Sequence, residues 1–147
     1  MFAAPSLQQS RSAALRAGGA RRVLDLGCGE GPLLRRLLEM DDLEQIVGLD
    51  ISATAIGALR SRYCADARVS LFHASFTEPD PRFENFDAAV MLETIEHINP
   101  SDLSRLERVL FGRHRPRQIL STTPNADCNA ALGVPSHRPR HPDHRFE

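Results

Sequence analysis

The sequence contains no tryptophan, one tyrosine and no lysine, so all 18 of its lysine-or-arginine positions are arginine. Its three cysteines, Cys28, Cys64 and Cys128, are widely spaced and include no Cys-x-x-Cys pair. This number and spacing fit a reducing cytoplasm better than a disulfide or zinc framework. No apolar run approaches the roughly 20 residues that a membrane helix needs, and residues 1–19 lack the layout of a secretory signal. We therefore expect a cytoplasmic protein that does not enter a membrane.

The length of 147 residues, with 41% hydrophobic and 25% charged side chains, predicts one globular domain over residues 1–147. A net charge of −1 hides an uneven distribution, because residues 37–98 hold twelve acids against four arginines. Residues 99–147 reverse the balance with eight arginines against five acids, and they hold four of the six histidines. Two interpretations of this basic segment stay open: a solvated surface and a polyanion-binding surface.

Short apolar runs alternate along the chain with segments of helical periodicity. The predicted strands are residues 22–26, 45–50, 69–73, 86–92 and 118–122. The predicted helices are residues 7–17, 32–40, 52–63 and 101–111, the first within a lead-in over residues 1–20. This alternation predicts an α/β fold with a parallel sheet and helices on both faces. Ligands of such sheets bind beyond the carboxyl ends of the strands, which is where the candidate site residues fall.

A glycine-rich turn, Gly27-Cys-Gly-Glu-Gly31, stands directly between the first predicted strand and the following helix. Its glycines allow the backbone to approach a ligand closely, and the helix N-terminus offers N–H groups that have no partner in the helix. The spacing differs from the G-x-G-x-x-G of dinucleotide folds, and a nicotinamide site or a purely structural turn are the alternatives. Asp25 precedes the turn, and its two possible roles are to order the turn or to contact the ligand.

Three metal-competent side chains follow the fourth predicted strand. Glu93, Glu96 and His97 are three and four residues apart, so one helical turn would present them on a shared face. Two carboxylates and one imidazole suit Mg²⁺, Mn²⁺ or Co²⁺ better than structural Zn²⁺. A further ligand would come from the histidine-rich tail, where the candidates are His137, His141 and His144. The alternative is that His97 only hydrogen-bonds a carboxylate at the floor of the pocket.

The stretch Leu24-Asp-Leu-Gly-Cys-Gly-Glu-Gly31 resembles the first motif of the class I S-adenosylmethionine-dependent methyltransferases, which have a Rossmann-like fold. In that class the acid that ends the second strand accepts hydrogen bonds from the cofactor ribose, and Asp50 matches it. Ser75, after the third strand, matches the place of the adenine contacts. The resemblance thus implies S-adenosylmethionine bound by Asp25, Gly27, Gly29, Gly31, Asp50 and Ser75.

Two downstream segments, Ser121-Thr-Thr-Pro-Asn125 and His141-Pro-Asp-His-Arg-Phe-Glu147, narrow this resemblance. Together with Glu93-Thr-Ile-Glu-His97 they resemble the family of methyltransferases that modify the 2′-OH of the 3′-terminal ribose of small RNA. The resemblance implies an enzyme that acts on the 3′ end of small RNA and that residues 126–147 complete a divalent metal site. The implied ligands are Glu93, Glu96, His97 and His144. Small-molecule methyltransferases carry a similar motif after the fourth strand, so a metal-independent enzyme of that kind is the first alternative.

The sequence departs from that family in two places. Cys128 stands where the family has a tyrosine, and the family continues past Glu147 into a helix and a final strand pair. We therefore expect a truncated domain in which residues 118–122 form an exposed sheet edge. The second alternative is accordingly a truncated cofactor-binding domain without activity. The oligomeric state stays open, a monomer included.

The resemblance implies a chemical step in which a ribose hydroxyl must lose its proton. A divalent cation lowers the pKa of an oxygen that it contacts, and a vicinal 2′,3′-diol offers two such oxygens. The predicted proton acceptor is His97 or a neighbouring imidazole. Phe76 and Phe146 are the candidate platforms for base stacking, while His114 and His137 are expected to be solvated. The predicted phosphate contacts are Arg113, Arg115, Arg117, Arg138, Arg140 and Arg145.

Overall fold

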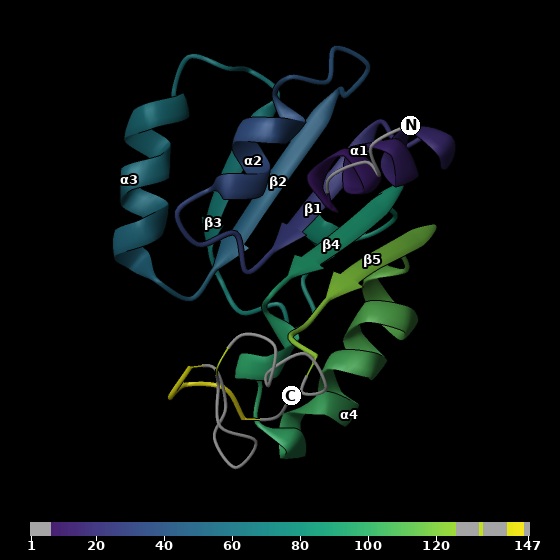
Figure 1. Ribbon diagram of the computed structural model, residues 1–147. Helices are drawn as coiled ribbons and strands as arrows, with labels where there is room; N and C mark the ends of the chain where they lie inside the picture. The colour runs from purple at the N-terminus through teal and green to yellow at the C-terminus, as the bar shows by residue number, and fades with distance from the viewer. Residues whose placement is uncertain (1–6, 126–132, 134–140, 146–147) are drawn as a thin grey trace.

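The computed structural model of the protein describes residues 7–125, 133 and 141–145. Five strands form one parallel sheet in the order β3-β2-β1-β4-β5 (Figure 1). They are β1 (Arg22–Leu26), β2 (Gln45–Asp50), β3 (Val69–His73), β4 (Ala88–Leu92) and β5 (Gln118–Thr122). In this sheet β5 pairs only with β4, so it forms an edge of the described sheet, as the sequence predicts.

In the described part of the chain, one helix precedes the first strand, and three helices and three short helical turns connect the strands. The helices are α1 (Leu7–Ala17), α2 (Pro32–Leu37), α3 (Ala53–Tyr63) and α4 (Pro100–Val109). The turns are η1 (Pro81–Phe83) and η2 (Ile95–His97), which are 3₁₀ helices, and η3 (Leu110–His114), which is a π-helix. Among the described residues, no helix combines the length and the apolar character that crossing a membrane requires.

Helices cover both faces of the sheet, as predicted. Val23 of β1 packs into one buried cluster with residues of α1, α2 and α3, including Leu34 and Ile56. Leu24, the next residue, faces the other side and packs into a second cluster with Leu106 of α4. This alternation follows from the two-residue repeat of side chains in a strand. The result is a three-layer α/β fold whose strands all end at the same edge.

Local signals set the boundaries of the helices at that edge. Pro32 starts α2, where a proline costs no hydrogen bond, and Ser52 caps α3 by accepting a hydrogen bond from the Ala55 N–H at 3.2 Å. Helix α2 ends at Leu37, short of the predicted residue 40. Met40 is nevertheless buried, so the apolar pattern that suggested a longer helix reflects burial in a turn.

The segments on either side of the candidate site also differ from their predicted bounds. Strand β4 begins at Ala88 instead of residue 86, and the carboxylate of the preceding Asp87 accepts hydrogen bonds from the Arg21 and Arg22 N–H groups at 2.9 and 2.8 Å. Helix α4 begins one residue earlier than predicted and ends at Val109. The π-helical turn η3 follows, and sequence periodicity did not indicate it.

The prediction that His114 is solvated is wrong, because this side chain is 0% exposed. The π-helical turn rotates it inward, where its ring lies edge-on to Phe83 with 5.8 Å between centroids. Its Nε2 accepts a hydrogen bond from the Asp80 N–H at 3.4 Å. Burial lowers the pKa of His114, against the nearby charges of Asp80 and Glu84, which raise it. The neutral imidazole is therefore part of the folded core.

Replacing His114 with glutamine is expected to change how stability depends on pH. Because the folded state holds the pKa of His114 below its ordinary value of 6.5, protonation as the pH falls through that value favours unfolding. Wild-type stability should thus decline relative to His114→Gln between pH 8 and pH 5, measured as the free energy of unfolding in urea. Parallel pH curves for the two proteins would show that this imidazole is not buried in its neutral form.

Candidate active site

The glycine-rich turn after β1 is built on left-handed backbone. Gly27, Gly29 and Gly31 have φ angles of 79°, 49° and 81°, which residues with side chains rarely adopt. The N–H groups of Gly27 and Cys28 both donate to the Leu49 carbonyl, at 2.8 and 2.9 Å. The turn is thereby fastened to the end of β2, and its glycines leave the backbone accessible at the carboxyl edge of the sheet.

Asp50 lies at the end of β2 beside this turn. One carboxylate oxygen accepts a hydrogen bond from the Gly29 N–H at 2.8 Å, and the other accepts one from the Ser52 N–H at 2.8 Å. Each carboxylate oxygen has two lone pairs, so each keeps one acceptor direction. The half-buried carboxylate is therefore held in one orientation and is still able to bind a hydroxyl group of a ligand.

Asp25 is a buried carboxyl group beneath the turn. It is 3% exposed, and its Oδ2 has no hydrogen-bond partner among the described residues. Burial, and after it the charge of Asp50, raises the pKa of Asp25 to about 7. Burial and then the charges of Asp25 and Asp50 raise the pKa of the Cys28 thiol to about 12, which keeps this thiol protonated. A positive group bound at the turn would lower the pKa of Asp25.

A cavity of about 510 Å³ joins the glycine turn to the predicted metal site. Its lining includes Gly27, Asp50 and Ser75 at one end and Glu93 and His97 at the other. The Ser75 hydroxyl lies 2.8 Å from the Thr77 hydroxyl and accepts the Thr77 N–H at 3.2 Å, so a local turn orients it. Three of the predicted cofactor residues and two of the predicted metal ligands thus line one cavity.

Sequence reasoning missed Ile51, which also lines this cavity. Its side chain is 72% exposed, an unusual state for a large apolar residue. It directly follows Asp50, the last residue of β2, at the edge of the sheet where ligands bind. This position in the sequence could have identified it as a candidate contact. An apolar side chain at the rim of a cavity offers a surface for a flat ring of a ligand.

The prediction that Glu93, Glu96 and His97 share one helical turn is wrong. Glu93 precedes η2 in left-handed conformation with a φ angle of 51°, and only Glu96 and His97 belong to the turn. The Glu93 N–H donates to the Thr122 carbonyl at 3.0 Å, which continues the β4–β5 pairing by one residue. The edge of the sheet therefore sets the direction of Glu93, and its exposed side chain lies on the cavity wall.

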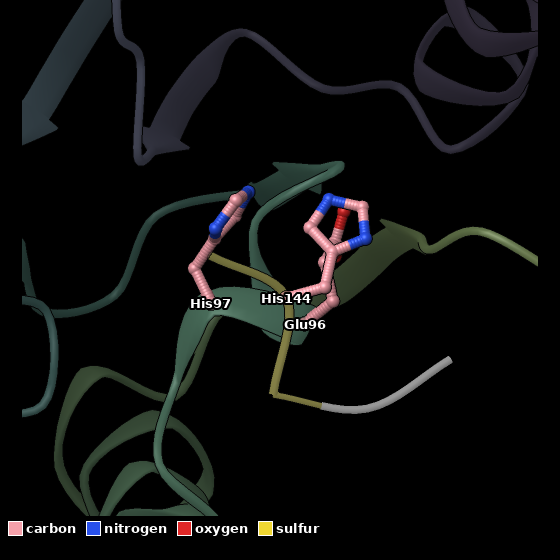
Figure 2. A group of neighbouring side chains, drawn as sticks. All are labelled: Glu96, His97 and His144. Atoms are coloured by element: carbon pink, nitrogen blue, oxygen red, sulfur yellow. The ribbon is translucent and has the colours of Figure 1, made fainter. Parts of the chain in front are cut away.

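Glu96 is a buried carboxylate that lacks hydrogen-bond partners. Its side chain is 0% exposed, and neither of its oxygens has a partner among the described residues. Ligand atoms of Glu96, His97 and His144 all lie within 4.8 Å of one another. Figure 2 shows the three side chains pointing into the same space, two from the turn after β4 and one from the C-terminal segment. A carboxylate and two imidazoles at this separation fit a divalent cation.

The C-terminal segment is attached to this turn through the backbone. The Arg145 N–H donates to the Glu96 carbonyl at 2.6 Å, and the His144 ring lies edge-on to His97 with 4.9 Å between centroids. The ring of His141 lies 6.3 Å from that of His97 and 5.7 Å from that of His144. Three imidazoles therefore gather beside this turn, and two of them, those of His97 and His144, have ligand atoms within 4.8 Å of a Glu96 oxygen.

Phe76, a predicted stacking platform, lines the cavity but is only 8% exposed. Most of the other predicted residues fall into two groups. Arg113, Arg115 and Arg117 precede β5 and so lie at the amino edge of the sheet, opposite the cavity. The other predicted residues lie outside the described part of the chain: Cys128, His137, Arg138, Arg140, Phe146 and Glu147.

Comparison with known proteins is consistent with this arrangement. Residues 23–115 match the family described as a methyltransferase domain. The chain is 35% identical over 138 residues to a small RNA 2′-O-methyltransferase of Rattus norvegicus, covering 86% of this chain and 34% of that protein. The chain thus spans about a third of the length of this curated relative.

Solved structures agree in fold and in sequence. The methyltransferase domain of bacterial CtHen1-C superposes with a TM-score of 0.80 at 37% identity, covering 90% of this chain and 71% of that one. The small RNA methyltransferase HEN1 superposes with a TM-score of 0.77 at 28% identity, covering 100% of this chain and 21% of that one. The chain therefore belongs to the methyltransferase-domain family and, within it, to the family of the small RNA 2′-O-methyltransferases.

Proposed function

We propose that this chain transfers a methyl group from S-adenosylmethionine to the 2′-OH of the 3′-terminal nucleotide of a small RNA, with the help of a divalent cation. The observation that carries the proposal is the Glu96 carboxylate, which is buried without hydrogen-bond partners among the described residues, beside His97 and His144. These side chains adjoin the cavity that begins at the glycine turn. Membership of the family of small RNA 2′-O-methyltransferases supports the choice of acceptor.

The cofactor end of the cavity suits S-adenosylmethionine in shape and charge. Asp50 has a free acceptor direction on each oxygen for a ribose diol, and Ile51 offers an apolar surface for adenine. Asp25 does not line the cavity, so its proposed role is electrostatic. A positive sulfonium or ammonium group of the cofactor would favour the ionised form of this carboxyl group, and the negative charge would in turn attract the cofactor. The proposed cofactor residues are Asp25, Gly27, Gly29, Gly31, Asp50 and Ser75.

The metal end of the cavity suits a hard or borderline cation such as Mg²⁺, Mn²⁺ or Co²⁺. Glu96, His97 and His144 would hold the ion, because a cation supplies the partner that both Glu96 oxygens lack. Glu93 is the proposed fourth ligand, from the adjoining cavity wall. When bound, such an ion lowers the pKa of a hydroxyl group that it contacts.

The chain's own residues then position the acceptor and take its proton. Methyl transfer forms a bond from the ribose oxygen to carbon while the carbon–sulfur bond breaks, and the hydroxyl proton must leave. We assign this proton to His97 or to a neighbouring imidazole of the cluster with His141 and His144. A 3′-terminal ribose has two vicinal hydroxyls and an internal one does not, which explains selection of the RNA end.

Replacing Asp50 with asparagine should weaken cofactor binding. Each carboxylate oxygen of Asp50 accepts one backbone N–H, so the amide N–H₂ of asparagine would face a donor at one of the two positions. The change also removes the negative charge that would bind the ribose hydroxyls of the cofactor. Hydrogen bonds to charged groups contribute about 1.5–3 kcal/mol, so the dissociation constant for S-adenosylmethionine should rise at least tenfold. Calorimetric titration measures this, with the exposed Asp41→Asn as the matched control. Equal affinity in wild type and Asp50→Asn would remove Asp50 from the site.

Replacing Glu96 with glutamine should separate metal binding from cofactor binding. The amide keeps the volume of the side chain but loses its charge, so Mn²⁺ binding followed by calorimetry should disappear. Methyl transfer should fall at least 100-fold, while affinity for S-adenosylmethionine stays within twofold of wild type. Glu107→Gln, on the exposed face of α4, is the control and should leave all three unchanged. Persisting Mn²⁺ binding, or a joint loss of cofactor affinity, contradicts the assigned role of Glu96.

The acceptor is tested with RNAs that differ only at the terminal sugar. Labelled methyl should transfer to an RNA that ends in ribose when Mn²⁺ is present. It should not transfer when EDTA is added, or when the terminal sugar is 2′-deoxyribose or 3′-deoxyribose. A small-molecule methyltransferase would ignore both RNA and chelator, and labelling that is the same under all conditions would refute the metal–diol account.

A further inference from the structure

The outer side of α4 and η3 carries arginines and one exposed aromatic ring. Arg105, Arg108, Phe111 and Arg115 recur at intervals of three and four residues, on the side away from the buried Leu106. Arg113 lies in the same π-helical turn as Phe111 and is exposed. We call Arg108, Phe111, Arg113 and Arg115 the α4–η3 surface.

The arginines of this surface are not neutralised by neighbouring acids. Arg105 pairs with Glu78 at 2.6 Å, and Arg117 lies 3.7 Å from Asp87, but both are outside the surface as defined. No ion pair involves Arg108, Arg113 or Arg115 within the described residues. Three uncompensated positive charges in eight residues complement a polyanion.

Phe111 adds a flat apolar group to the same surface. Its side chain is 65% exposed, and the other large hydrophobic residue of comparable exposure among the described residues, Ile51, lies at the cavity. Aromatic rings between arginines provide stacking platforms for unpaired bases. A polyanion that also carries flat rings is a single-stranded nucleic acid, so the two features point to one kind of partner.

The π-helical turn presents these side chains rigidly. The Arg115 N–H closes the turn on the Leu110 carbonyl at 2.9 Å, and the buried His114 anchors it against Phe83. Arg115 itself has a φ angle of 50°, which costs a residue with a side chain on the order of 1 kcal/mol. A glycine would adopt this conformation without strain, whereas this position carries an exposed arginine side chain.

Helix α4 links this surface to the cavity. Asn99 and Asp102, at the start of the helix, line the cavity, and η3 follows at its other end (Figure 1). Ten residues of α-helix span about 15 Å, at 1.5 Å per residue. Stacked nucleotides rise about 3.4 Å each, so this length corresponds to about four or five nucleotides.

We propose that the α4–η3 surface binds single-stranded RNA about four or five nucleotides upstream of the 3′ end that occupies the cavity. Arg108, Arg113 and Arg115 contact phosphates, and Phe111 stacks on one base. This inference rests on the proposed function, since it takes the RNA 3′ end as the acceptor. It adds that the RNA leaves the cavity along α4 and that an acceptor gains affinity once it is long enough to reach η3.

The test measures RNA binding and methyl transfer with RNAs of 12 and 3 nucleotides that share a 3′ end. Fluorescence anisotropy over a range of salt concentrations gives the affinity for the longer RNA. In Arg108→Ala/Arg113→Ala the slope of log affinity against log salt should shrink by about 1.4, because each contact to a single strand contributes about 0.7. Phe111→Leu should weaken binding about tenfold and Phe111→Trp should restore it. Arg35→Ala, an exposed arginine of α2, is the matched control and should change neither measure.

In methyl transfer, Arg108→Ala/Arg113→Ala and Phe111→Leu should each raise KM for the 12-nucleotide RNA at least fivefold. Both should leave KM for the trinucleotide unchanged. Equal effects on both RNAs, or unchanged affinity for the longer RNA, overturn the inference. Competition by polyglutamate as strong as that by RNA also overturns it, because the surface would then recognise charge alone. If wild-type protein methylates neither RNA, the proposed function falls, and the binding curves still decide whether this surface binds RNA.

Discussion

The candidate site depends on one buried carboxylate. Glu96 is 0% exposed and neither oxygen has a hydrogen-bond partner among the described residues. A carboxyl group buried without hydrogen bonds loses several kcal/mol of hydration unless a proton, a neighbouring charge or a metal compensates. The imidazoles of His97 and His144 stand where ligands of a shared cation would stand. The proposed divalent ion would supply the partner that both oxygens lack among the described residues.

Two direct contacts hold the turn that carries Glu96 between the C-terminal segment and the glycine turn. Arg145 is joined to the Glu96 carbonyl through its backbone N–H, which places His144 beside the turn after β4. On the other side, a side chain at residue 27 would collide with Thr94, so Gly27 lets the turn after β4 pack directly on the glycine turn. The glycine turn and the turn after β4 therefore pack against each other and line the same cavity.

The sequence predicts four of the five described strands with their observed bounds. Short apolar runs between turn signals leave little choice of where such a strand begins and ends. Periodicity reports which residues are buried but not which backbone buries them, so it overextended α2 and missed the π-helical turn that buries His114. Glu93 shows the same limit. Its spacing from Glu96 suggests a shared helical turn, whereas pairing with β5 holds it in left-handed conformation. The proximity of His144 to Glu96 came from resemblance alone, since no local pattern joins them.

The most direct test of the central claim is the ligand set of bound Mn²⁺. Pulsed electron paramagnetic resonance of the Mn²⁺-loaded protein, with histidine labelled with ¹⁵N, detects imidazole nitrogens that are bonded to the ion. The account predicts coupling to two histidine nitrogens in wild type and to one in His144→Ala. A spectrum without ¹⁵N coupling, or one that the His144 substitution leaves unchanged, would contradict it.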